Sequence, residues 1–181
     1  DTGNYDITVE GVRYDGNTTI TYPFKVLPLM DPADGYGALQ IDAAIKRHKP
    51  DVVWLLNDLW IHGVYLANKA TLDVPVVAYY PVDTPNMKWG YAMGLGAVSQ
   101  AVAYTKFGAT ETAAAMRSGV DLLFQSFESQ GLTMDQRAKW MAIDHPTSNK
   151  LHVRLDRLAR YQNLGGYKVI PHGLDHELFE P

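Results

Sequence analysis

Short apolar runs alternate with helical patterns along the middle of this chain, and this alternation is the strongest constraint on its fold. Residues 51–56 and 74–80 are apolar almost throughout, as expected of strands covered on both faces. A helical pattern over about 61–70 separates them, and residues 101–105 and 167–170 repeat the strand pattern later in the chain. This order predicts an α/β fold with a doubly wound, mostly parallel sheet.

Composition restricts the class of protein further. The chain has 181 residues, 46% hydrophobic and 20% charged, which fits one globular domain over 1–181. A net charge of −4 gives no indication of a nucleic-acid partner. The absence of cysteine excludes disulfides, thiolate metal sites and a cysteine nucleophile. No apolar run approaches the roughly 18 residues of a membrane-spanning helix, and the chain starts with Asp1, which suggests a piece of a longer or processed protein.

Further strands and helices are predicted on both sides of these central strands. Residues 5–11 alternate as a strand should, and residues 22–29 are extended but contain two prolines. Residues 37–48 have the spacing of an amphipathic helix, and residues 110–118 form an alanine-rich helix that Gly119 is expected to stop. Residues 121–166 interrupt the alternation, so we expect a helical insertion there.

Polar side chains directly follow the predicted strands. The pairs are Asn57-Asp58, Asp83-Thr84, Lys106-Phe107 and His172-Gly173. In open parallel sheets, ligands bind beyond the carboxyl ends of the strands. The sequence therefore predicts a binding crevice at this edge of the sheet.

Two acidic clusters stand out at that edge, and each has two interpretations. Asp58, beside Asn57 and Trp60, could hold a sugar by hydrogen bonds and ring stacking, or could cap the following helix. Asp83 is held in a stiff turn between Pro81 and Pro85, as a ligand-binding carboxylate or as an Asx turn without a ligand.

Other chemistry receives less support from the sequence. No GxxxxGK[ST], GxSxG or HExxH motif is present, and no GxGxxG follows a strand. His172 and His176 are the one histidine pair with a ligand-like spacing, across a turn, and we predict no metal site. His62 is better explained as a structural residue, and Trp89 as a core residue than as a stacking platform.

A basic stripe marks the second half of the interrupted region. Lys150, Arg154, Arg157 and Arg160 recur at helical spacing, with Asp156 among them. The stripe could bind an anionic acceptor or lipid headgroups at a membrane surface, or could be an ordinary solvated helix face. Both interpretations stay open.

The last residues form the most specific motif. Residues 169–181, VIPHGLDHELFEP, resemble the vIPxGxDxxxFxP segment of retaining glycosyltransferases with the GT-B fold, family GT4. Three further stretches resemble segments of that family in the same order: 51–60 its PDvv strand and loop, 74–83 its vPvvxyxPvD strand, and 103–109 its vaySxfGa segment. The resemblance covers most of 5–120 and 167–181.

The resemblance implies a Rossmann-like, acceptor-side half of a hexosyltransferase. Such an enzyme moves a sugar from a nucleotide sugar, which is a substrate rather than a cofactor, to a sugar, lipid or other hydroxyl acceptor. Retention in the family is attributed to front-face attack assisted by the leaving phosphate. By position, Asp58 and Asp83 would be catalytic, Asn57, Trp60, Thr84 and Lys106 would bind the acceptor, and His172, Gly173 and Asp175 would lie at the hinge near the donor.

The chain also departs from the family. Residues 5–11 look like the family's second strand, so its opening strand and Gly-rich loop are missing, as is the donor-binding domain expected after Pro181. We therefore expect this chain alone to be inactive, and the parent enzyme to be cytoplasmic, with the basic helix as its candidate membrane contact. The alternatives are a non-catalytic module that binds a glycan or a protein partner and, by fold analogy alone, a sugar-nucleotide epimerase.

Overall fold

The computed structural model describes residues 5–12, 19–26, 33–38, 40–67, 73–133, 135–136 and 155–171. They belong to two compact units, Asp1–Gln40 and Ile41–Pro181. The predicted hinge residues His172, Gly173 and Asp175, the His172/His176 pair, and Lys150 and Arg154 of the basic stripe lie outside the described residues.

The first unit contains an antiparallel pair of strands. Strand β1 (Tyr5–Val12) pairs with β2 (Thr19–Val26), in a register that sets Tyr5 opposite Val26. A strand was predicted over 5–11, and β2 overlaps the extended stretch predicted over 22–29. The structure pairs the two strands in a two-stranded sheet of their own. Pro23 of β2 lies opposite Thr8. Proline has no backbone N–H to donate, and a strand at the edge of a sheet tolerates this loss.

The second unit contains a four-stranded sheet in the order β3-β4-β5-β6, and every neighbouring pair is parallel. The strands are β3 (Val53–Leu56), β4 (Val76–Tyr80), β5 (Gln100–Ala103) and β6 (Tyr167–Val169). The prediction of an α/β fold with a parallel sheet is therefore confirmed.

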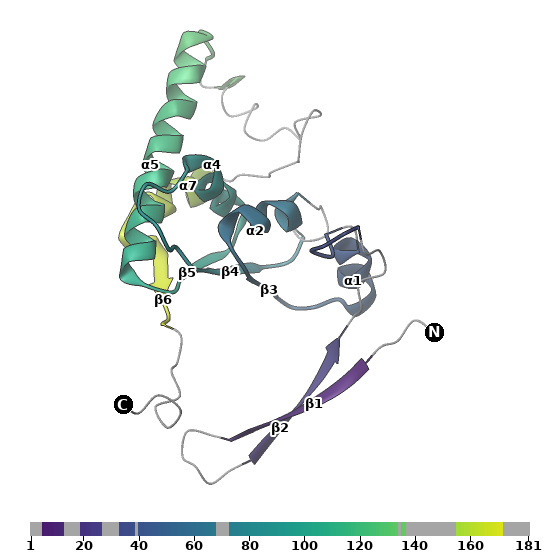
Figure 1. The fold of residues 1–181 in the computed structure, drawn as a ribbon. Helices are drawn as coiled ribbons and strands as arrows, with labels where there is room; N and C mark the ends of the chain where they lie inside the picture. The colour runs from purple at the N-terminus through teal and green to yellow at the C-terminus, as the bar shows by residue number, and fades with distance from the viewer. Residues whose placement is uncertain are drawn as a thin grey trace, which may run out of the picture. The chain divides into compact units, whose positions relative to one another are not determined.

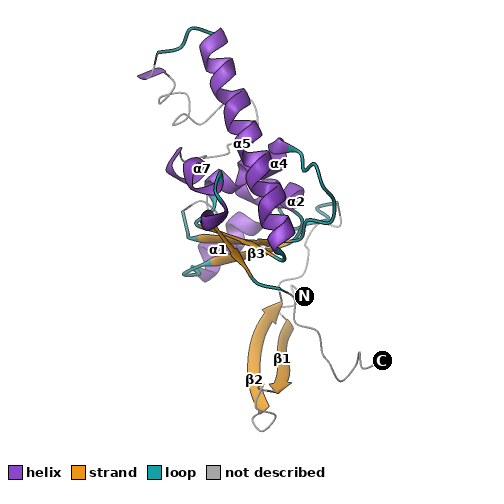
Figure 2. Ribbon diagram, turned by 90° about the vertical axis from the view of Figure 1, so that its left-hand side faces the viewer, coloured by secondary structure: helices purple, strands orange, loops and turns teal. Residues whose placement is uncertain are grey.

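Helices separate the strands along the chain. They are α1 (Ile41–His48), α2 (Leu59–Leu66), α4 (Trp89–Met93), α5 (Lys106–Ser129) and α7 (Leu155–Tyr161), with 3₁₀ turns η1 (Gly94–Ala97) and η2 (Leu164–Gly166). Helices α2, α4, α5 and α7 lie on one side of the sheet (Figures 1 and 2).

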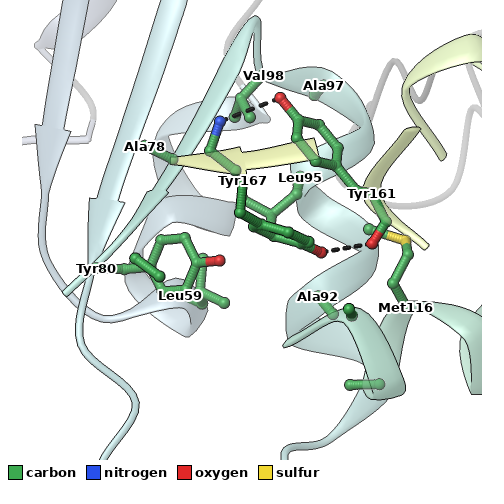
Figure 3. Close-up of a cluster of buried hydrophobic side chains, with 14 of the residues drawn as sticks. Leu59, Ala78, Tyr80, Ala92, Leu95, Ala97, Val98, Met116, Tyr161 and Tyr167 are labelled. Atoms are coloured by element: carbon green, nitrogen blue, oxygen red, sulfur yellow. Dashed lines mark hydrogen bonds between the residues drawn. The ribbon is translucent and has the colours of Figure 1, made fainter. Parts of the chain in front are cut away.

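The core forms between this helical layer and one face of the sheet. Leu55, Ala78, Ala101 and Tyr167 are paired across the four strands, and all four are buried. Two buried tyrosines lie at its β5–β6 end (Figure 3): the Tyr167 hydroxyl donates to the Tyr161 carbonyl at 2.6 Å, and the Tyr161 hydroxyl accepts from the Ala101 amide at 3.1 Å. Their polar atoms are thus satisfied inside an otherwise apolar cluster.

The other face of β3 corrects one prediction. Strand 51–56 was expected to be covered on both faces, but Trp54 and Leu56 are 53% and 57% exposed. Strand β3 is one of the two edge strands of the described sheet, and these two side chains point away from the face that carries Leu55. The apolar run therefore indicated a parallel strand correctly but not its coverage.

Helix α5 corrects another prediction. It does not stop at Gly119 but continues to Ser129, so the first residues of the expected 121–166 insertion belong to its C-terminal part. A Cβ at Gly119 would lie 2.9 Å from the Met93 side chain, so the glycine allows α4 to approach α5 closely. At the other end of the insertion, Leu158 and Tyr161 of α7 are buried in the core.

Candidate functional site

A pocket of about 340 Å³ opens where β3 and β4 end, and four predicted site residues line it. Asp58 and Trp60 come from the start of α2, and Asp83 and Thr84 from the turn that follows β4. The structure thus brings together residues that the sequence separates by more than twenty positions, at the edge of the sheet that the parallel-strand rule predicts.

The carboxylate of Asp58 is not used to cap α2. Asp58 occupies the N-cap position in an extended conformation, but its side chain makes no capping hydrogen bond. Its backbone amide donates instead to the side-chain oxygen of Asn57 at 2.9 Å, and the Asn57 amide donates to the Tyr79 carbonyl at 3.3 Å. Asn57 does not line the pocket and instead fixes the backbone that carries Asp58.

The turn that carries Asp83 is tied to helix α5. Both Asp83 and Thr84 are exposed. Asn86, three residues after Asp83, has a positive φ of 62°, a conformation that asparagine tolerates better than most residues. Its amide donates to a carboxylate oxygen of Glu111 at 2.8 Å. The turn is therefore held from both sides, by the end of β4 and by α5.

Tyr104 lies near the candidate site without lining the pocket, and the sequence did not single it out. Partial burial, the neighbouring Tyr79 phenol and the carboxylates of Asp58 and Asp83 raise the pKa of Tyr104 above its ordinary value. The ring of Tyr104 lies 4.4 Å from that of Tyr79, centroid to centroid. Residues 101–105 were predicted as strand, but β5 ends at Ala103, so Tyr104 is the first side chain after the strand and the same rule would have identified it.

Lys106 lies elsewhere. It is the first residue of α5, its side chain is exposed, and it does not line the pocket. Thr105 caps this helix, because its hydroxyl accepts a hydrogen bond from the Gly108 amide at 2.9 Å. Gly108 faces Val82, so the start of α5 packs against the residues that follow β4.

His62 is buried and does not line the pocket. Its side chain is 1% exposed, and burial lowers its pKa to about 4, although the charge of Asp58 acts in the opposite direction. The imidazole is therefore neutral near pH 7. This placement agrees with the structural role expected from the sequence.

The described part of the basic stripe faces the protein. The Arg157 guanidinium donates to the Ala97 carbonyl and, at 3.4 Å, to the Ser99 hydroxyl. The Arg160 guanidinium donates to the Ser99 carbonyl at 3.3 Å and to the Gln100 side chain at 2.8 Å. Both arginines therefore fasten α7 to residues 97–100, which lead from η1 into β5, a role that neither interpretation of the stripe anticipated.

Two features are absent from the part of the chain that the structure describes. Among those residues, no helix is both long and apolar enough to cross a membrane. Within the same ranges, no three histidine, aspartate or glutamate side chains come together as metal ligands.

Comparisons with models of protein families, with curated proteins and with solved structures find no match to this chain. The resemblance to glycosyltransferase family GT4 is thus a prediction that rests on the four sequence segments. Two of these segments, 51–60 and 74–83, supply Asp58, Trp60 and Asp83 to the pocket.

Proposed function

We propose that this chain is the acceptor-binding half of a retaining glycosyltransferase, with the doubly wound Rossmann-like architecture of a GT-B half. One observation supports this most: Asp58 and Asp83, which follow the two neighbouring parallel strands β3 and β4, line one pocket together with Trp60. The four sequence segments that resemble family GT4 provide separate support.

The residues of the pocket suit a sugar hydroxyl. Carboxylates accept hydrogen bonds from hydroxyl groups, and the two aspartates offer four oxygens between them. The Trp60 side chain, 46% exposed, offers an aromatic face on which a pyranose ring can stack. Aromatic surface combined with a few polar groups is the usual composition of a specific small-molecule site.

In the proposed reaction, Asp58 and Asp83 orient the acceptor hydroxyl toward the anomeric carbon of a nucleotide sugar held on a second domain. The glycosidic bond forms as the bond to the leaving phosphate breaks, on the same face of the sugar, and the hydroxyl proton passes to the departing phosphate oxygen. The chain's own contribution is positioning, which supplies much of the rate in such reactions. A nucleotide-sugar donor also favours a cytoplasmic location.

The test uses the intact protein that contains this chain, with UDP-, GDP- and ADP-linked hexoses as donors. We expect Asp58→Asn and Asp83→Asn each to lower sugar transfer by about 100-fold, a typical loss for a positioning group. Asp121→Asn, an exposed residue of α5 outside the pocket, is the matched control. Full transfer by the Asp58/Asp83 double variant would refute the assignment. Sugar binding that depends on Asp58 without any transfer would indicate the glycan-binding module instead.

A further inference from the structure

A second, larger pocket of about 880 Å³ adjoins the first. The two pockets share Asn86, Met87, Lys88 and Tyr91, so residues 86–88 and the start of α4 form a common wall. Helix α5 supplies the opposite side of the second pocket through Glu111, Ala114, Ala115 and Ser118. A ligand that fills the first pocket and continues past this wall would therefore enter the second.

The common wall is held in place by its contacts with helix α5. Asn86 has a positive φ and its amide donates to Glu111, which fastens the wall to α5. At the far side, Gly119 lets α4 pack closely against α5. The second pocket is thus bounded by two helices and a tethered turn, and a preformed site loses less free energy when it binds a ligand.

The lining of the second pocket combines aromatic surface with hydrogen-bonding groups. Trp89 and Tyr91 are 48% and 41% exposed, which is high for such large side chains. Sequence reasoning favoured Trp89 as a core residue, and this exposure does not support that assignment. Ala114 and Ala115 contribute only small side chains to the lining, while Asn86, Glu111 and Ser118 provide donors and acceptors.

The charges in this pocket favour a neutral ligand. Lys88 and Glu111 are its two charged lining residues, and their charges are opposite. A nucleotide or another phosphate-bearing ligand would be expected to meet several cationic groups. A ring with hydroxyl groups on its edge and C–H bonds on its face matches the aromatic and polar lining without net charge.

We infer that the second pocket binds a second sugar ring, so that the acceptor is a neutral oligosaccharide or glycoside of at least two rings. The reacting ring lies between Asp58 and Asp83, and the next ring stacks on Trp89 and Tyr91. This inference rests on the proposed function, because the first pocket must hold the reacting sugar.

The test measures binding of the labelled full chain to a sugar array. The array carries glucose, galactose, mannose and N-acetylglucosamine, and each sugar is present as a single ring and as a linked di- and tetrasaccharide. At least one oligosaccharide series is expected to bind about tenfold more tightly than its single ring, the gain of one stacked ring. Trp89→Ala should remove this gain, and Trp89→Phe should restore most of it. Trp54→Ala, on the open face of β3, is the matched control.

The outcomes separate the two proposals. If Asp58→Asn weakens binding of the single ring but Trp89→Ala leaves the oligosaccharide gain unchanged, the second sugar site is refuted and the acceptor role stands. If the folded chain binds no sugar on the array, the oligosaccharide acceptor is refuted, and the transfer assay with the Asp58 and Asp83 variants decides the acceptor role separately. Circular dichroism of Trp89→Ala establishes that the variant is folded, and Tyr91→Ala provides an independent substitution in the same pocket.

Discussion

The imidazole of His62 meets the ring of Tyr80 edge-on, with ring centroids 6.4 Å apart and planes at 88°. Both nitrogens of His62 and the Tyr80 hydroxyl are buried, and within the described residues none of these three atoms makes a hydrogen bond of regular geometry. Burial raises the pKa of Tyr80 above its ordinary value, and the adjacent Thr112 hydroxyl opposes this shift only in part. This polar pair lies between the helix that follows Asp58 and the strand that precedes Asp83.

We predict that the stability of the fold falls as the pH drops from 6.5 to about 4. His62 has a folded-state pKa of about 4 against an ordinary value of 6.5, so in this window the unfolded chain binds a proton that the folded chain does not. Stability from this residue is therefore complete above pH 6.5 and declines below it. The full shift corresponds to about 3 kcal/mol. Urea unfolding at a series of pH values measures it.

His62→Leu should flatten this part of the pH profile, because leucine fills a similar buried volume without a titrating group. His48→Gln, at an exposed position on α1, is the matched control and should leave the profile unchanged. An unchanged slope between pH 4 and 6.5 in His62→Leu would show that other groups cause the acid sensitivity.

Two adjacent glycines in η2 offer a second, sharply contrasted prediction. A Cβ at Gly166 would collide with the backbone carbonyl of Arg160, whereas one at Gly165 meets nothing within 4 Å. Backbone cannot move aside as a flexible side chain can, so Gly166→Ala should destabilise the fold by about 2 kcal/mol or more. Gly165→Ala should change stability by less than about 0.5 kcal/mol. Equal melting temperatures for the two variants would contradict this geometry.

The arginines of α7 provide a third prediction. Arg157→Ala removes hydrogen bonds to Ala97 and Ser99 from a partly buried site and should cost about 2 kcal/mol in urea unfolding. Arg47→Ala on α1, where the side chain is exposed, should have little effect. If Arg157→Ala unfolds at the wild-type urea concentration, these contacts do not stabilise the protein. An Arg157 variant can therefore lose vesicle binding because it unfolds. Such a loss indicates lipid contact only if the variant is shown to be folded.

The sequence predicted the parallel strands of the second unit well because their apolar runs are short, flanked by turns and separated by helical patterns. It also predicted the location of the pocket, since the carboxyl ends of parallel strands share an edge whatever the strand order. Asp58, Asp83 and Thr84 followed directly from that rule, and Trp60 from its place beside Asp58. Asn57 and Lys106, predicted in the same way, do not line the pocket.

The predictions that were wrong or incomplete have physical causes. Gly119 was interpreted as a helix stop, because local propensity does not reveal a neighbouring helix that needs the space. Coverage of β3 depends on which elements pack on each face, and periodicity within one strand carries no such information. Tyr104 was missed through an error of two residues in the end of β5, and boundaries are the least predictable property of an element.

Tyr104 leads to the last prediction. An ordinary tyrosine is already protonated near pH 7, and the carboxylates of Asp58 and Asp83 raise the pKa of Tyr104 further, so its hydroxyl is a hydrogen-bond donor near the pocket. Tyr104→Phe keeps the ring against Tyr79 but removes that donor, and it should weaken acceptor binding by about tenfold, or about 1.4 kcal/mol, with little change in stability. Tyr65→Phe, near the far end of α2, is the matched control for loss of a phenol. Titration calorimetry with the tightest-binding sugar of the array measures both variants, and wild-type affinity in Tyr104→Phe would remove this residue from the site.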